Sequence, residues 1–169
     1  YFGDDHAPHS IVKCSPGIVF FIQGHQPILE NNYTARTNAH FQNFLKIDGV
    51  EIVAVCDLVE EKVKRMQEWA KDAGKRVPTG YFKGETDFKR MCAEEDLDLV
   101  FTATPWNWHV PVMVEAMKNG SHAATEVPAA TAIDECWEMV ETAEKYNKHC
   151  VMMENVCYME PEMMIYNMV

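Results

Sequence analysis

The chain has 169 residues, of which 47% are apolar and 24% charged, and its formal net charge is −11. This composition is typical of a globular domain that buries a sizeable core. The net negative charge argues against nucleic acid and anionic membrane surfaces as partners, because both would repel the protein. No apolar run approaches the length of a membrane span, so we expect no nucleic acid and no membrane among its partners.

The N-terminal part of the chain begins without periodicity. Residues 1–16 show no hydrophobic pattern, and we interpret them as an irregular N-terminal arm. Residues 17–22 (GIVFFI) form a short apolar run that predicts a buried parallel strand. The polar residues 23–35 are predicted to form a loop. Apolar residues at helical spacing then predict a helix over residues 38–47, which ends at Asp48-Gly49.

The rest of the chain alternates apolar runs with helical patterns. The further predicted strands are residues 50–56, 81–82, 99–103, 122–125 and 150–153. The further predicted helices are residues 59–73, 87–93, 110–118, 133–143 and a pattern that begins at residue 161. Because the strands are continuous apolar runs, they favour a parallel sheet that is buried on both faces. We expect an α/β fold, Rossmann-like and doubly wound, with a mostly parallel sheet. Its strands should end near Gln23, Cys56, Thr104, Glu126 and Glu154.

The six cysteines are scattered, and none forms a C-x-x-C pair. Most of them fall in apolar segments, so we expect buried free thiols rather than a disulfide framework. His6 and His9, with Asp4 and Asp5, could hold a metal, but we interpret them as a solvated polar tail. No other spacing of His, Cys, Asp or Glu predicts a metal site.

Polar and aromatic residues follow the predicted strand ends, where an open parallel sheet binds its ligands. Asp57 could accept hydrogen bonds from the hydroxyls of an adenosine ribose, or it could cap the next helix. Trp106 and Trp108 could form the wall of a cofactor site or stack on a sugar, or they could simply cover the domain surface.

Three further residues could act near the same sheet edge. His109 could begin a helix and orient the loop before it. Glu126 could hydrogen-bond a ribose or polarise a substrate hydroxyl, and Tyr158 could donate to a substrate. None of these residues has the spacing of a catalytic triad.

The turn after the first strand lacks the glycines of a dinucleotide site. That site uses G-x-G-x-x-G, so that the backbone can approach the pyrophosphate at a helix N-terminus. Here Gly24 is the only glycine between the predicted first strand and Gly49, and Pro27 removes a backbone donor. The turn therefore predicts that NAD⁺ binding by this chain is weakened.

Several segments resemble a known family. GVEIVAVCD, TPWNWH and the series EVPAA, ECW and KHCVMMENV resemble the Gfo/Idh/MocA oxidoreductase family. More narrowly, they resemble its branch of NAD-dependent α-N-acetylgalactosaminidases. Ordinary dehydrogenases of the family carry Glu-Lys-Pro, in which the Lys assists hydride transfer. This chain has Glu126-Val127-Pro128, which matches the glycosidase branch.

The resemblance implies a redox-assisted glycosidase that acts on terminal α-N-acetylgalactosamine, with NAD as its cofactor. NAD⁺ would take a hydride from C3, loss of the C2 proton would expel the aglycone from C1, and water addition and hydride return would follow. One alternative is a sugar or polyol dehydrogenase of the same family. Another is a degenerate Rossmann domain without a cofactor.

The resemblance also implies residue roles. Tyr158 would reach the substrate, while most catalytic groups would lie in a substrate domain absent from this chain. We therefore expect the isolated chain to be inactive. In the disturbed first turn, Arg36 could meet the phosphates in place of the missing backbone donors. The implied cofactor-binding residues are Gly24, Arg36, Asp57, Thr104, Pro105, Trp106, Trp108, His109, Glu126 and Asn155.

The expected organisation is an arm over residues 1–16, a Rossmann-like dinucleotide-binding domain over residues 17–158, and the start of a connection to the missing domain over residues 159–169. The resemblance implies a small carbohydrate substrate and allows a homo-oligomer. It also implies a periplasmic or secreted bacterial protein, with a cytoplasmic location as the alternative. Because the chain does not begin with Met, we interpret it as processed or as part of a longer protein.

Overall fold

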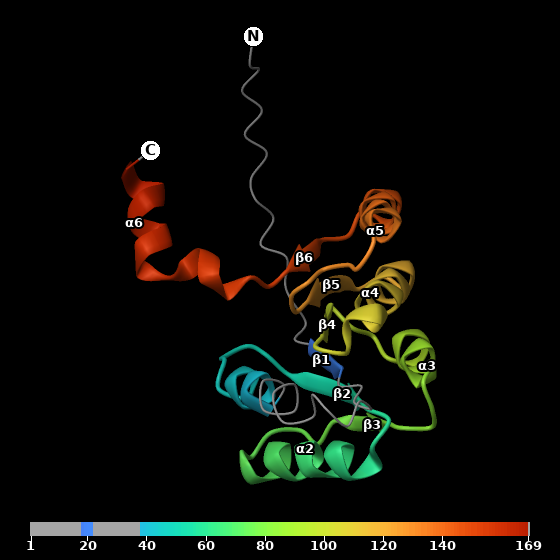
Figure 1. Ribbon diagram of the computed structural model, residues 1–169. Coiled ribbons are helices and arrows are strands. Elements are labelled where there is room, and N and C mark those ends of the chain that lie inside the picture. Colours follow the sequence, from blue (N-terminus) through green and yellow to red (C-terminus); the bar gives the residue numbers. More distant parts are fainter. Residues whose placement is uncertain (1–17, 22–37, 169) are drawn as a thin grey trace, which may run out of the picture.

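The computed structural model describes residues 18–21 and 38–168, and their strands form one parallel sheet. The strand order is β3-β2-β1-β4-β5-β6, with parallel pairing throughout (Figure 1). The sequence reverses direction across the sheet at β1, which lies between β2 and β4. This order is that of a doubly wound dinucleotide-binding sheet, so the predicted fold class is confirmed.

The elements have the following bounds. The strands are β1 (Ile18–Phe21), β2 (Ile52–Cys56), β3 (Thr79–Tyr81), β4 (Leu99–Thr102), β5 (His122–Thr125) and β6 (Cys150–Met152). The helices are residues 38–44, α2 (Glu60–Asp72), α3 (Asp87–Glu94), α4 (His109–Lys118), α5 (Ile133–Tyr146) and α6 (Glu160–Met168). Two short 3-10 helices, η1 (Trp106–Trp108) and η2 (Asn155–Tyr158), precede α4 and α6.

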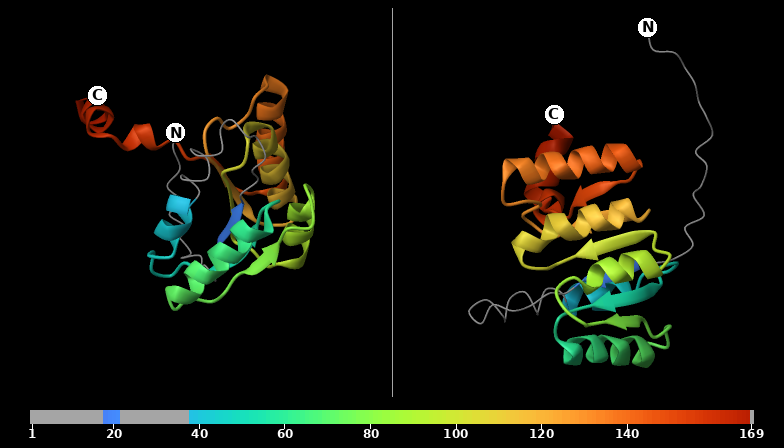
Figure 2. Two further views of the ribbon diagram at one scale, coloured as in Figure 1. Left: turned by 60° about the horizontal axis from the view of Figure 1, so that its bottom comes forward. Right: turned by 90° about the vertical axis from the view of Figure 1, so that its right-hand side faces the viewer.

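Helices cover both faces of the sheet (Figure 2). Helix 38–44 and α2 lie on one face, where Phe41, Met66 and Phe101 belong to one buried cluster. Helices α3, α4 and α5 lie on the other face, over a second buried cluster. Most residues of α4 belong to this cluster. Because α4 packs between its neighbours, it is apolar almost all round. Each layer therefore fixes the loops at the carboxyl edge of the sheet.

The boundaries differ from prediction by a few residues at some ends. Strand β1 is described over Ile18–Phe21, and its predicted end near Gln23 lies outside the described residues. Strand β3 begins two residues before its predicted start. Helix α5 continues to Tyr146, past the predicted end, and Asn147 then adopts a left-handed conformation with φ of 51° that stops it. The predicted bounds of β5 are those observed.

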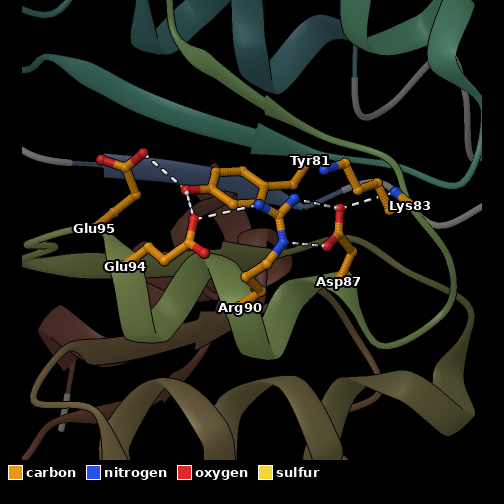
Figure 3. Close-up of polar contacts among 6 residues, drawn as sticks. All are labelled: Tyr81, Lys83, Asp87, Arg90, Glu94 and Glu95. Carbon is orange, nitrogen blue, oxygen red and sulfur yellow. Dashed lines mark hydrogen bonds and ion pairs between the residues drawn. The ribbon is translucent and has the colours of Figure 1, made fainter.

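A polar network joins β3 to α3 (Figure 3). The Arg90 guanidinium lies 4.7 Å from the centre of the Tyr81 ring and donates to both carboxylate oxygens of Asp87, at 2.8 and 3.2 Å. The Tyr81 hydroxyl lies 2.9 Å from a carboxylate oxygen of Glu95 and 3.2 Å from one of Glu94. This network holds β3 against α3, next to β2, which Asp57 follows.

The C-terminal part of the chain is the least covered. Helix α6 projects away from the sheet (Figure 1), and neither η2 nor α6 contains a buried residue. Tyr166 and Met168 are 78% and 81% exposed. The predicted domain boundaries stay predictions, and the arm over residues 1–16 lies outside the described residues.

Five of the six cysteines lie in the described part, and all five are free thiols. Cys56 and Cys92 are buried as expected, and burial raises the pKa of both thiols. The expectation of burial is wrong for Cys136 and Cys157, which are exposed because they lie on the outer side of α5 and in η2. No helix among the described residues is both long enough and apolar enough to cross a membrane.

Candidate functional site

The carboxyl ends of the parallel strands meet at one edge of the sheet, and most of the candidate residues lie there. Asp57 follows β2, Thr104 lies just past β4, Glu126 follows β5, and Asn155 begins η2 after β6. Ligands of open parallel sheets bind at this edge, beside the strand at which the order reverses. The structure thus brings the predicted positions to one side of the domain.

Asp57 is buried but only half satisfied. It is 2% exposed, and its Oδ1 accepts a hydrogen bond of 2.7 Å from the backbone N–H of Val59, just before α2. Its Oδ2 is buried and has no partner among the described residues. Asp57 does not cap α2 itself, since the N-cap residue Val59 has no side-chain cap hydrogen bond. Its Oδ1 instead holds the turn before the helix, and its Oδ2 is available to a hydroxyl donor, so the ribose role stays a prediction.

The burial of Asp57 changes its acidity. Burial raises the pKa of this carboxyl group from 3.8 to about 7, although the Val59 hydrogen bond and the charges of Lys62 and Arg65 lower it. A ligand hydroxyl that donates to Oδ2 would favour the ionised form. Ligand binding at Asp57 would therefore release a proton near neutral pH.

His109 joins the loops that follow β4 and β5. It is the first residue of α4 and is 1% exposed. Its Nε2 lies 2.8 Å from the carbonyl oxygen of Thr104, and its Nδ1 lies 2.6 Å from that of Pro128. A carbonyl oxygen only accepts and a neutral imidazole carries one N–H, so such a ring donates to one of these two oxygens and contacts the other. His109 thus orients both loops from beneath rather than from an open surface.

The aromatic loop before α4 divides into an inner and an outer part. Trp108 packs on the core cluster, with its ring 6.0 Å from that of Phe88, whereas Trp106 is 50% exposed. Thr104 is buried, with its hydroxyl 3.0 Å from that of Thr102. That this loop, including Pro105, lies beside the nicotinamide stays a prediction.

A pocket of about 630 Å³ opens between helix 38–44 and the end of β6. Its apolar wall consists of Phe44, Phe101, Val151, Met152 and Met153. Its polar residues include His40, Asn43, Glu126, Asn155 and Tyr158. An apolar pocket with a few convergent polar groups is typical of a small-molecule site. The structure thus brings Glu126, Asn155 and Tyr158 together, while the residues from Thr104 to His109 do not line this pocket.

One pocket contact joins distant parts of the sequence. His40 Nε2 lies 2.6 Å from Glu126 Oε1. His40 comes from helix 38–44, and Glu126 follows β5. The family resemblance matches His40 to a histidine that follows the family's first turn, but it does not pair His40 with Glu126. Nothing in the spacing of the two residues indicates that they meet.

The remaining predicted residues are less constrained. Tyr158 lies at the end of η2 and is 80% exposed. Gly24 and Arg36 lie outside the described residues, and so does the loop on which the predicted weakening of NAD⁺ binding rests. Among residues 18–21 and 38–168, no group of three or more His, Cys, Asp or Glu side chains is placed to hold a metal ion.

The site fits an NAD cofactor at one well-defined point. A ribose hydroxyl would supply the donor that the buried Oδ2 of Asp57 lacks among the described residues. The pocket beside Glu126 lies on the other side of the point where the strand order reverses, since Asp57 follows β2 and Glu126 follows β5. A dinucleotide that lies across this edge would place its two halves over these two regions.

Comparisons with known proteins agree with this geometry. The sequence model of the GFO_IDH_MocA family, described as an oxidoreductase family with an NAD-binding Rossmann fold, matches residues 30–154. A glycosyl hydrolase family 109 protein of Solibacter usitatus is 46% identical over 136 residues, which are 79% of this chain and 31% of that protein. An α-N-acetylgalactosaminidase of Bacteroides fragilis is 47% identical over 117 residues, which are 69% of this chain and 27% of that protein. The chain thus spans less than a third of the length of these relatives.

Solved structures give the same fold. The scyllo-inositol dehydrogenase of Lactobacillus casei with bound NAD(H) and scyllo-inositol matches 90% of this chain and 40% of its own, with a TM-score of 0.69 and 18% identity. The WlbA dehydrogenase of Chromobacterium violaceum, in complex with NADH and UDP-GlcNAcA, matches 91% of this chain and 40% of its own, with a TM-score of 0.62 and 25% identity.

Proposed function

Since this chain belongs to the GFO_IDH_MocA oxidoreductase family with an NAD-binding Rossmann fold, we propose that it is the cofactor-binding part of an NAD-dependent glycosidase. The observation that carries the cofactor half of this proposal is Asp57 at the carboxyl end of β2, whose buried Oδ2 has no partner among the described residues. The glycosidase half rests on the identity of 46–47% to the family 109 protein and to the α-N-acetylgalactosaminidase. The proposed substrate is a terminal α-N-acetylgalactosamine.

Each region of the site has a task in this proposal. Asp57 would hold the adenosine ribose, while Glu126 and Asn155 would lie near the nicotinamide and Tyr158 near the sugar. His109 keeps the loops after β4 and β5 in place. Bound NAD⁺ would supply a hydride acceptor for transient oxidation at C3 of the sugar, which acidifies the C2 proton and lets the aglycone leave from C1. The residues of this chain bind and orient the cofactor, and the domain that completes the enzyme supplies the other catalytic groups.

A dehydrogenase of the same family is the second candidate, and the likeness to the WlbA dehydrogenase favours it. The two candidates differ at residue 127. Val127 cannot assist a proton or hydride transfer as an amine can, so it favours the glycosidase. An assay also separates the two candidates, because only a dehydrogenase accumulates reduced cofactor in proportion to its product.

The test uses aryl α-N-acetylgalactosaminides and NAD⁺ with the full-length protein. We expect release of the aryl group without net accumulation of NADH. Accumulation of NADH in proportion to sugar consumed would replace the glycosidase with the dehydrogenase. The 169-residue chain alone should release no aryl group above background, and measured turnover would show that the catalytic groups have been misplaced.

A further inference from the structure

The contact between His40 and Glu126 is placed to do more than join a helix to a strand. Its length of 2.6 Å is at the short end of the distances at which an N–H group and a carboxylate oxygen form a hydrogen bond. The side chains are 32% and 17% exposed, so both reach the pocket surface while most of each is covered. Both residues line the pocket of about 630 Å³. The contact therefore lies at the pocket and not in the core.

His40 is held from two sides. Its ring lies 5.2 Å from the ring of Phe101 on β4, with the planes tilted by 60°. Its helix is anchored by Phe41, which is fully buried in the core cluster on that face of the sheet. A histidine with a fixed ring presents Nε2 in one direction, and that direction is toward Glu126.

Glu126 depends on this contact for its orientation. Its Oε1 faces His40, and its Oε2 has a contact of 3.4 Å with the backbone N–H of Val127, near the upper limit for a hydrogen bond. Oε2 therefore retains capacity to accept a hydrogen bond from a ligand in the pocket. Without His40, the carboxylate could rotate about its side-chain bonds and lose that orientation.

We propose that His40 is a positioning residue for Glu126, so that the two side chains act as one unit on a dinucleotide ligand in the pocket. This inference rests on the proposed function, because the ligand is NAD(H). Glu126 accepts a hydrogen bond from a hydroxyl or amide donor of the ligand, and His40 acts only through Glu126. The binding free energies of the two residues are therefore coupled rather than additive.

The experiment is a mutant cycle on the 169-residue chain with NADH as the probe. NADH affinity is measured by saturation-transfer NMR, which detects weak binding, for the wild type, His40→Ala, Glu126→Gln and the double variant. We expect each single variant to weaken binding about fivefold or more, and the double variant to be no weaker than the weaker single variant. Effects that multiply in the double variant, or single variants that bind like the wild type, would overturn the proposal.

Two further variants separate positioning from simple helix docking. His40→Gln keeps an N–H donor at a similar reach, so it should recover most of the NADH affinity. Gln42→Ala changes a residue of the same helix that does not line the pocket, so it should leave the affinity unchanged. If His40→Ala lowers the melting temperature but not the affinity, the contact is only a structural clasp and the proposal is wrong.

The outcomes also separate this inference from the proposed function. NADH binding that is weakened by Asp57→Asn but unaffected by the His40 and Glu126 variants would keep the cofactor domain and reject the positioning role. No detectable NADH binding by the wild-type chain would reject both.

Discussion

The ends of β2 and β5 carry two carboxylates at equivalent places, yet the chain holds them in different ways. Asp57 is buried, and its only side-chain hydrogen bond in the described structure is to Val59, two residues along the chain. Glu126 is partly exposed, and its partner His40 comes from a distant helix. The first site is built from a local turn and the second from tertiary contacts.

This difference has chemical consequences. Among the described residues, no opposite charge lies at hydrogen-bonding distance of Asp57, so burial dominates and raises its pKa to about 7. Glu126 has a hydrogen-bonding partner, His40, at 2.6 Å, and His109 contacts the loop that follows β5. We therefore expect the β2 end to respond mainly to pH and ligand, and the β5 end to respond mainly to loss of its partners.

The largest expected effect follows from removing His109. His109→Ala removes the ring that contacts the carbonyl oxygens of Thr104 and Pro128, so that at least one of them loses its donor, and it opens a cavity below both loops. A buried polar group without a partner costs about 1–3 kcal/mol, so the free energy of unfolding should fall by about 3 kcal/mol. Chemical denaturation measures this change. Trp106→Ala, in the same loop but half exposed, should cost less than about 1 kcal/mol; equal losses would show that His109 does not fasten the loops.

The next effect concerns the β2 end. Asp57→Ala should weaken NAD⁺ binding by about 1.5–3 kcal/mol, or roughly tenfold or more, because a hydrogen-bonded carboxylate is lost. Titration calorimetry on the full-length protein measures the affinity, and thermal melting shows whether the variant is folded. An unchanged affinity in a folded variant would reduce Asp57 to a cap of the turn into α2.

A smaller effect is expected from pH. The folded protein holds the Asp57 proton up to about pH 7, whereas the unfolded chain releases it near the ordinary value of 3.8. The native state therefore binds more protons across this window, and the contribution of Asp57 to stability falls as pH rises from about 4 to 7. We expect a loss of about 1–2 kcal/mol, less than the full shift implies at about 1.4 kcal/mol per unit, because partial opening hydrates the group.

Asp57→Asn is the matched control for this pH dependence. Its amide oxygen still accepts from Val59, but it carries no titrating group. Urea denaturation at several pH values between 4 and 8 should show a flatter profile for this variant than for the wild type. Parallel profiles would contradict the raised pKa.

The smallest effect is expected at an exposed ion pair. Arg76 Nη1 lies 2.8 Å from Glu51 Oε1, but both side chains are largely solvent-accessible. Arg76→Ala should change the free energy of unfolding by less than about 1 kcal/mol, and the change should shrink in high salt. A loss as large as that of His109→Ala would show that short contacts, rather than burial, decide these effects.

The same contrast explains what the sequence could predict. The apolar strands, the helical patterns and Asp57 at the end of β2 follow from local spacing, so the fold class and the position of Asp57 were predictable. The pairing of His40 with Glu126 and the contacts of His109 depend on how the helices dock, and no local pattern encodes them. For the same reason, the role of the Trp106–Trp108 loop could not be decided from its composition.

For the turn after the first strand, the glycine pattern and the family give opposite expectations for NAD binding. Gly24 is the only glycine between β1 and Gly49, so side chains should keep the pyrophosphate away from backbone donors. The dissociation constant for NAD should therefore lie above the micromolar range. Family membership, by contrast, favours a cofactor at this turn.

Titration of NADH into the purified 169-residue chain, followed by saturation-transfer NMR, tests the central claim most directly. The account predicts saturable binding in the high-micromolar to millimolar range, about tenfold or more weaker in Asp57→Ala. Binding at micromolar or tighter affinity would keep the cofactor site but refute the weakening at the first turn. The absence of saturable binding, or binding that Asp57→Ala leaves unchanged, would contradict the claim that this domain holds NAD at the end of β2.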